Sequence, residues 1–223
     1  MKNNYLKNLS AWIFLLVILF IGALFLFGIV THEVLGEQDE KLDIRVFGFL
    51  SSHVITPQLT GIMKLITYFA SAIFLNIAFA LIVLIYLIQK KWNRAIEIAA
   101  IGIGGFLINF FMKLFFHRPR PPHPLIAPLK NFSYPSGHAT AGFIFYGLLV
   151  YLIWKTNIPK PYKWLIGSIL ILFSLLIGFS RIYLRVHYTS DVVAGFCIGF
   201  AWLALSIWVI EAIKKRKLKK LVK

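Results

Sequence analysis

Residues 134–143 read YPSGHATAGF, in which a polar trio opens directly into an apolar run. The trio is Ser136, Gly137 and His138, and the apolar run continues to Trp154. Serine is favoured at the N-cap of a helix, and the free backbone N–H groups of a helix N-terminus can bind an anion. The stretch therefore predicts a helix that begins at a polar site. Two interpretations are open: a plain turn with a helix cap, or a cradle for an anion with a proton donor beside it.

The whole chain has the composition of a membrane protein. Hydrophobic residues make up 59% of its 223 residues and charged residues only 14%, against about a quarter charged in soluble domains. The formal net charge is +16, but no soluble basic domain is present to hold a nucleic acid. The positive charge instead predicts loops that face an anionic lipid surface. We expect a single membrane domain over residues 1–223 and no nucleic-acid partner. The one cysteine, Cys197, excludes an internal disulfide.

Six stretches approach the roughly 20 apolar residues that a membrane-spanning helix needs. We expect helices because an open strand cannot satisfy its backbone hydrogen bonds in lipid. The first stretch is too long for the apolar part of a signal peptide, so we expect it to be retained. The fold class is therefore an all-α bundle of six transmembrane helices. The expected spans are about 11–31, 62–88, 94–116, 139–155, 163–181 and 192–212.

Basic residues gather in the connections on one side of this expected bundle. They occupy the N-terminus, the turns at 89–94 and 155–163, and the tail KKRKLKKLVK. Positive charge marks the cytoplasmic side of membrane loops. Both termini are therefore expected in the cytoplasm, with the segments at 32–61, 113–138 and 181–191 on the extracytoplasmic side.

The first outer segment carries five of the eight acidic residues of the chain. Its later part, LDIRVFGFL at residues 42–50, mixes apolar and charged positions. Two interpretations are open: an amphipathic helix in the membrane interface, or a solvated connector that packs on the other loops.

The other two outer segments concentrate ionisable groups, which are costly in a membrane and usually functional there. The second begins KLFFHRPRPP and contains no acid between Lys113 and His138, and the third reads SRIYLRVHYTSD. Arginine matches phosphate oxygens with a planar fork and lysine with a point charge. These segments therefore favour a phosphate site, although Lys113 and Arg120 could also extend to the interface without binding anything.

His187 and Asp191 are four residues apart, and on a helix they would share one face. A carboxylate on one ring nitrogen orients an imidazole and makes the other nitrogen more basic. His187 could then attack phosphorus, while His138 could protonate the leaving alkoxide. A pair with this spacing can equally be a surface or capping contact.

Together these residues resemble the type 2 phosphatidic acid phosphatase superfamily, whose pattern is K-x6-RP, PSGH and SR-x5-H-x3-D. Here the three parts read KLFFHRPRP at 113–121, PSGH at 135–138 and SRIYLRVHYTSD at 180–191. The six-span layout is similar to the membrane branch of that family, which includes bacterial phosphatidylglycerophosphate phosphatases of type B and undecaprenyl pyrophosphate phosphatases.

The resemblance implies that the enzyme uses no metal ion and no other cofactor. It implies His187 as the nucleophile, Asp191 as its orienting partner and His138 as the general acid. The implied phosphate-binding set is Lys113, Arg120, Ser136, Gly137 and Arg181.

Two arginines in these motifs have weaker or open assignments. Arg118 also precedes a proline, but only Arg120 keeps the six-residue gap from Lys113, so Arg118 is the lesser candidate. The role of Arg185 stays open between substrate and lipid headgroups.

We therefore expect a multi-pass enzyme of the plasma membrane, with its site on the extracytoplasmic face and no obligate protein partner indicated. The expected substrate is a lipid phosphate in the bilayer: phosphatidylglycerophosphate, phosphatidic acid or undecaprenyl pyrophosphate. One alternative is a phosphotransferase that passes the same phosphohistidine to a second lipid. A non-enzymatic transporter is disfavoured because the spans carry few midplane polar groups, chiefly Asn76 and Asn109. For Asn109 we expect an interhelical hydrogen bond.

Overall fold

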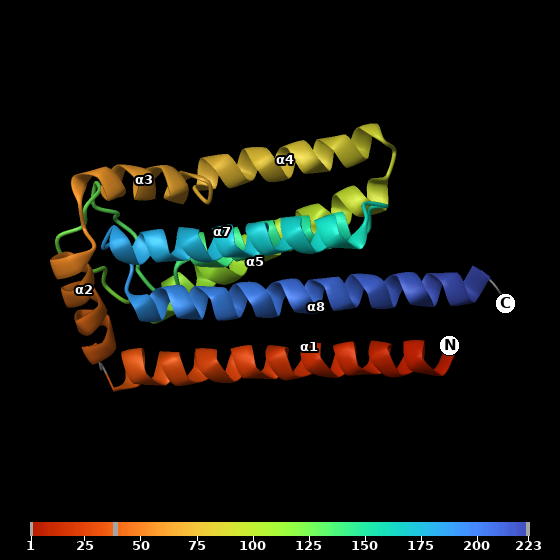
Figure 1. Ribbon diagram of the computed structural model, residues 1–223, viewed down its shortest axis with the longest axis horizontal. Helices are drawn as coiled ribbons and strands as arrows, with labels where there is room; N and C mark the ends of the chain where they lie inside the picture. Colours follow the sequence, from red (N-terminus) through yellow and green to blue (C-terminus); the bar gives the residue numbers. More distant parts are fainter. Residues whose placement is uncertain (1, 38–39, 222–223) are drawn as a thin grey trace.

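The computed structural model describes residues 2–37 and 40–221, and this part of the chain is helical apart from its connections, of which the one at 117–136 is the longest. Helix α1 continues into the π-helical turn η1, and seven further α-helices follow (Figure 1). Their bounds are α1 Lys2–Thr31, η1 His32–Gly36, α2 Lys41–His53, α3 Pro57–Tyr68, α4 Ala72–Ile88, α5 Trp92–Phe116, α6 Gly137–Trp154, α7 Lys160–Tyr183 and α8 Thr189–Leu221.

Six segments of the described residues are long and apolar enough to cross a membrane, which confirms the expected all-helical bundle of six candidate spans. They are Phe14–Gly36, Pro57–Ile88, Trp92–Phe116, Gly137–Trp154, Lys160–Tyr183 and Thr189–Lys217. For five of them, each end lies within a few residues of the expected bound.

The second span differs from the expected helix at 62–88 because it consists of two helices. Ser71 interrupts it by accepting a hydrogen bond from the backbone N–H of Phe74, at 3.2 Å, and so caps a new helix, α4. At the break, the carbonyl of Phe69 accepts a hydrogen bond of 2.9 Å from the Tyr146 hydroxyl of α6. The break is therefore stabilised by a neighbouring helix, as interrupted membrane helices require.

The central helix of the bundle is α6, which packs against α5, α7 and α8. Around it, α1 lies along α8, α3 along α7 and α4 along α5. The start of α1, the end of α8 and the α4–α5 and α6–α7 turns lie at one end of the bundle (Figure 1). Helix α2 crosses the opposite end, together with the segment at 117–136.

Glycines let α8 approach the beginning of α6 closely. A Cβ atom at Gly195 would lie 2.8 Å from the carbonyl oxygen of Ser136, and one at Gly199 would lie 2.9 Å from that of Thr140. Neither distance is compatible with a side chain, so small residues set the separation of the two helices. The first turns of α6 and α8 are thereby held side by side.

Helix α2 contains the stretch 42–50, so this part of the first outer segment is helical. Its Leu50 is buried in a cluster with Ala139, Ile182 and Val192, from the ends of α6, α7 and α8. Its Leu42, Ile44 and Phe49 are exposed. The helix therefore packs on the other elements at this end of the bundle through one face and leaves apolar side chains free on another.

Candidate active site

The three sequence motifs meet at the end of the bundle that α2 crosses. Lys113 lies in the last turn of α5, and Arg120 follows in the connection to α6. Ser136, Gly137 and His138 form the start of α6, and Arg181 lies in the last turn of α7. His187 is in the α7–α8 connection, and Asp191 is in the first turn of α8.

His187 and Asp191 form a buried pair. The ring Nδ1 of His187 lies 3.3 Å from Oδ2 of Asp191, and the two residues are 2% and 0% exposed. The backbone N–H of Tyr188 donates to the same carboxylate oxygen at 2.9 Å. The expectation of a shared helix face is wrong, because His187 precedes α8, which begins at Thr189. The contact is made instead by the tight turn that leads into the helix.

The surroundings of His187 define which ring nitrogen carries the proton. Nδ1 faces a carboxylate, which accepts hydrogen bonds, and Nε2 lies 3.2 Å from a guanidinium nitrogen of Arg120, which can only donate. The proton therefore belongs on Nδ1, and Nε2 keeps its lone pair. Burial lowers the pKa of His187 to about 3, although Asp191 opposes this shift, so the free ring is neutral.

Three cations of the predicted phosphate-binding set are held by neutral partners. Arg120 donates from Nε to the carbonyl of Asn131 at 2.8 Å and from Nη2 to the side chain of the same residue at 2.6 Å. Lys113 donates to the carbonyl of Phe132 at 2.8 Å. Arg181, which is 2% exposed, donates to the hydroxyl of Thr67 at 2.7 Å. No carboxylate of the described residues forms an ion pair with these cations, so their charge is available for an anion.

His138 lies among these charges. It interacts electrostatically with Arg181, His187, Arg120 and Lys113. Its imidazole makes no hydrogen bond within the described parts of the chain. The side chain is therefore free to bond to a group bound between the cations and His187.

Ser136 and Gly137 form the wall of the site at the start of α6. The hydroxyl of Ser136 accepts from the backbone N–H of Ala139 at 3.5 Å, which confirms the predicted N-cap. A Cβ atom at residue 137 would lie 3.2 Å from Oδ1 of Asn109 and 3.9 Å from Cε of Lys113. Glycine at this position therefore leaves room beside the lysine.

Asn109 makes the interhelical hydrogen bond expected of it, from its Nδ2 to the hydroxyl of Thr140 on α6, at 3.2 Å. Arg185 reaches away from the cations, because its Nη2 contacts the hydroxyl of Ser51 on α2. Neither side chain is part of the charged cluster around His187.

Two buried residues, Ser133 and Arg118, contact the His187–Asp191 pair although sequence reasoning gives them no role or a lesser one. The hydroxyl of Ser133 contacts both Asp191 and His187, and a lone serine in a loop gives no signal of this. Arg118 is 4% exposed and lies 2.7 Å from Asp191. Burial opposes the charge of Arg118, but Asp191 and Asp43 outweigh it and raise its pKa. Burial lowers the pKa of Arg120, so the two neighbouring arginines occupy opposite electrostatic surroundings.

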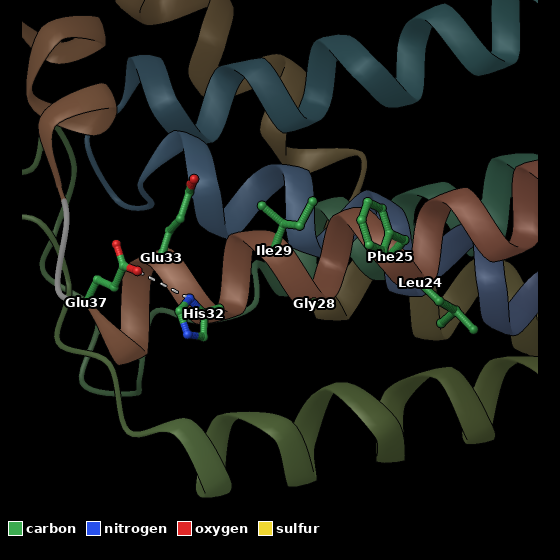
Figure 2. Close-up of a pocket in the computed structure, with 7 residues that line it drawn as sticks. All are labelled: Leu24, Phe25, Gly28, Ile29, His32, Glu33 and Glu37. Carbon is green, nitrogen blue, oxygen red and sulfur yellow. Dashed lines mark ion pairs between the residues drawn. The ribbon is translucent and has the colours of Figure 1, made fainter.

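An open hollow lies elsewhere, along the end of α1 and η1 (Figure 2). His32 and Glu37 form an ion pair of 3.6 Å at its rim. Its lining is Leu24, Phe25, Gly28, Ile29, His32, Glu33 and Glu37. It includes no residue of the three motifs, and the described residues contain no group of three His, Cys, Asp or Glu side chains that could hold a metal ion.

Comparison with known proteins finds similar sequences among lipid phosphatases. Phosphatidylglycerophosphatase B of Bacillus subtilis is 30% identical over 165 residues, which cover 71% of this chain and 79% of that protein. Undecaprenyl-diphosphatase BcrC of Bacillus subtilis is 33% identical over 160 residues, which cover 66% of this chain and 75% of that protein.

The fold is similar to the crystal structure of a transmembrane PAP2 type phosphatidylglycerolphosphate phosphatase from Bacillus subtilis. The TM-score is 0.71 at 24% identity, over 90% of this chain and 96% of that one. The family model of the PAP2 superfamily matches residues 94–215, which contain all three motifs. Since this match covers more than half of the sequence, the chain belongs to the PAP2 superfamily.

Proposed function

We propose that this chain is a membrane phosphatase that hydrolyses a lipid phosphate through a phosphohistidine on His187. The observation that carries the proposal is the environment of that ring. Its Nε2 holds a lone pair and faces Arg120, while its Nδ1 is held by Asp191. A nucleophile aimed at cations that lack a counter-charge is the arrangement that phosphoryl transfer needs.

In the proposed first step, Arg120, Lys113 and Arg181 neutralise the oxygens of the phosphoryl group. Nε2 of His187 attacks phosphorus, and the bond from phosphorus to the lipid oxygen breaks. Protonated His138 gives its proton to the departing lipid oxygen. The ring of His187 becomes positively charged, and Asp191 stabilises that charge through Nδ1–H.

In the proposed second step, neutral His138 removes a proton from a water molecule that attacks the same phosphorus. The bond between phosphorus and Nε2 of His187 breaks, phosphate leaves, and the ring recovers its lone pair. His138 is again protonated and ready for the next substrate. Acid and base roles thus alternate on one imidazole, and the free enzyme is regenerated without a cofactor or a metal ion.

The proposed substrate class is a bilayer lipid that ends in a phosphate or diphosphate. The named Bacillus relatives support phosphatidylglycerophosphate and undecaprenyl diphosphate as candidates, and phosphatidic acid has the same reacting group. Leu114 and Phe115 expose apolar surface next to Lys113, where lipid chains could lie. We further propose that the chain resides in the plasma membrane with both termini in the cytoplasm, so that the site faces the extracytoplasmic side. The basic turns at the opposite end of the bundle support this orientation.

The test is phosphate release by the purified protein in detergent, with a panel of these lipids and a divalent-metal chelator present. His187→Ala is expected to lose activity by about a thousandfold or more, as loss of a nucleophile does. Arg185→Ala is the matched control, because Arg185 is in the same motif but contacts Ser51 on α2. It is expected to keep activity within a few-fold of the wild type, since it touches no group of the site.

Three outcomes would contradict parts of the proposal. Retention of most activity by His187→Ala would exclude His187 as the nucleophile. Strict dependence on a divalent metal would exclude the metal-free reaction. No phosphate release from a single lipid, together with phosphorylation of a second lipid once it is added, would replace the hydrolase by a phosphotransferase.

A further inference from the structure

The two Arg-Pro pairs of the second outer segment hold opposite sides of the His187–Asp191 pair. Arg120 faces Nε2 of His187, as described above. Arg118 donates from Nη1 to Oδ1 of Asp191 at 2.7 Å, while Oδ2 of that carboxylate serves His187. Oδ2 of Asp191 therefore faces His187, and Oδ1, which points away from the nucleophile, is held by Arg118.

Arg118 is itself held by α2. Its Nη2 lies 3.1 Å from Oδ2 of Asp43, which is 2% exposed. Asp43 also accepts hydrogen bonds from Ser190, through Oδ1 from the backbone N–H at 3.0 Å and through Oδ2 from the hydroxyl. One carboxylate from α2 thus binds Arg118 and caps the first turn of α8, the turn that carries Asp191.

This group is a network of charges that is mostly buried. The guanidinium of Arg118 pairs with Asp43 and Asp191 and also with the partly exposed Glu40, at 3.3 Å, while its Cζ stacks 4.0 Å from the centre of the Tyr188 ring. Losing the charge of Arg118 would leave the buried carboxylates of Asp43 and Asp191 without a counter-charge. Losing the charge of Asp43 would remove a contact that holds Arg118 against Asp191. After substitution of Arg118 or Asp43, the carboxylate of Asp191 is therefore expected to move or rotate, and the ring of His187 is expected to follow it.

We infer that Asp43 and Arg118 are positioning residues, through which α2 fixes the carboxylate of Asp191 and thereby the nucleophilic ring of His187. Neither touches the reacting atoms. Asp43 lies outside residues 94–215, which the family model matches, so this chain supports the site from an element beyond that region. The inference rests on the proposed function, because it assigns these residues a part in the same reaction.

The test compares Asp43→Asn, which keeps the size of the side chain, with Arg118→Lys, which keeps the charge but loses the fork. Outer partners of metal-bound histidines are typically worth about 10–100-fold in metal affinity or activity, and we expect an effect of the same size for the partners of this histidine. We expect kcat to fall by that amount in each variant with KM within about twofold, because the phosphate-binding cations are unchanged. The double variant should lose little more than Arg118→Lys alone, because both substitutions act on one path.

The control for general destabilisation is Glu97→Gln. Glu97 pairs with Arg94 at 3.3 Å and with Lys214 at 2.8 Å, at the end of the bundle away from the site. It is expected to lower the thermal unfolding temperature while kcat stays at the wild-type value. The thermal unfolding temperature is measured for every variant. If Asp43→Asn loses more kcat than Glu97→Gln at the same loss of stability, general destabilisation does not explain the difference.

A second readout does not depend on turnover. Nitrogen NMR of protein labelled in its six histidines reports which ring nitrogen of His187 carries the proton, with His187→Asn identifying the signal. The wild type is expected to show a single form protonated on Nδ1, and both positioning variants a mixture of the two neutral forms.

The outcomes separate the two proposals. If the wild type hydrolyses none of the lipids but the NMR forms change as expected, the proposed function fails and the positioning contact stands. Wild-type kcat in both variants, a change in KM alone, or an unchanged single Nδ1-protonated ring would overturn the positioning role.

Discussion

At the scale of single residues, the chemistry of His187 is set by its surroundings rather than by its identity. The ring is buried between Asp191 and Arg120, and burial lowers its pKa from about 6.5 to about 3. The sequence motifs and the family resemblance nominate His187, His138 and the cations, and the structure brings these residues together. The contacts of Arg118 are not predictable in this way, because Asp43 and Asp191 lie 75 and 73 residues from it and no periodic pattern connects them.

The lowered pKa of His187 gives a prediction about pH. Because the neutral ring is favoured, we expect it to stay unprotonated at pH 5, where an ordinary histidine is mostly charged. Unfolded His187 takes up a proton near pH 6.5 and folded His187 only near 3, so this residue makes the folded state less stable as pH falls through that window. A nitrogen NMR titration of the ligand-free protein measures the effect. A His187 signal that titrates near pH 6.5 would contradict it.

At the scale of elements, the break between α3 and α4 has a direct consequence for the site. It ends α3 just after Thr67, whose hydroxyl accepts a hydrogen bond from Arg181 at 2.7 Å. Thr67→Val keeps the shape and removes the acceptor. A hydrogen bond to a charged group is worth about 1.5–3 kcal/mol, so kcat/KM should fall about tenfold or more. Thr60→Val is the control, since Thr60 is also on α3 and its hydroxyl is hydrogen-bonded to Tyr183 of α7 rather than to Arg181. Equal effects of the two substitutions on kcat/KM would show that the contact with Arg181 has no special part.

The same helices show how far sequence patterns reach. Hydropathy locates all six candidate spans because lipid-facing helices must be apolar over their length. The start of α3 had a recognisable signal, a Thr56 cap followed by Pro57 at the first helical position, but polar residues after it reduce the hydropathy there. The break had almost none, since Ser71 is a small residue inside an apolar run. Its stability comes from the hydroxyl of Tyr146, which belongs to a distant part of the sequence.

At the scale of the whole molecule, the two ends of the bundle differ in chemistry. One end holds the uncompensated cations, His187 and the buried Asp43–Arg118–Asp191 network. The other holds basic turns and a smaller set of ion pairs, in which Glu211 binds Lys155 at 2.9 Å. The proposed active site and the basic turns that support the proposed orientation thus lie at opposite ends, so the orientation can be tested without measuring activity.

That test uses single cysteines at the two ends in a Cys197→Ala background, which removes the buried native thiol. Lys130 is exposed in the connection near the site, and Asn157 is exposed in the α6–α7 turn. Because positive loops stay in the cytoplasm, a membrane-impermeant maleimide should label Lys130→Cys on intact cells and Asn157→Cys only after permeabilisation. The reverse pattern would place the site on the cytoplasmic side. Labelling of both cysteines on intact cells would mean that α6, the helix between the two positions, does not separate them across the membrane.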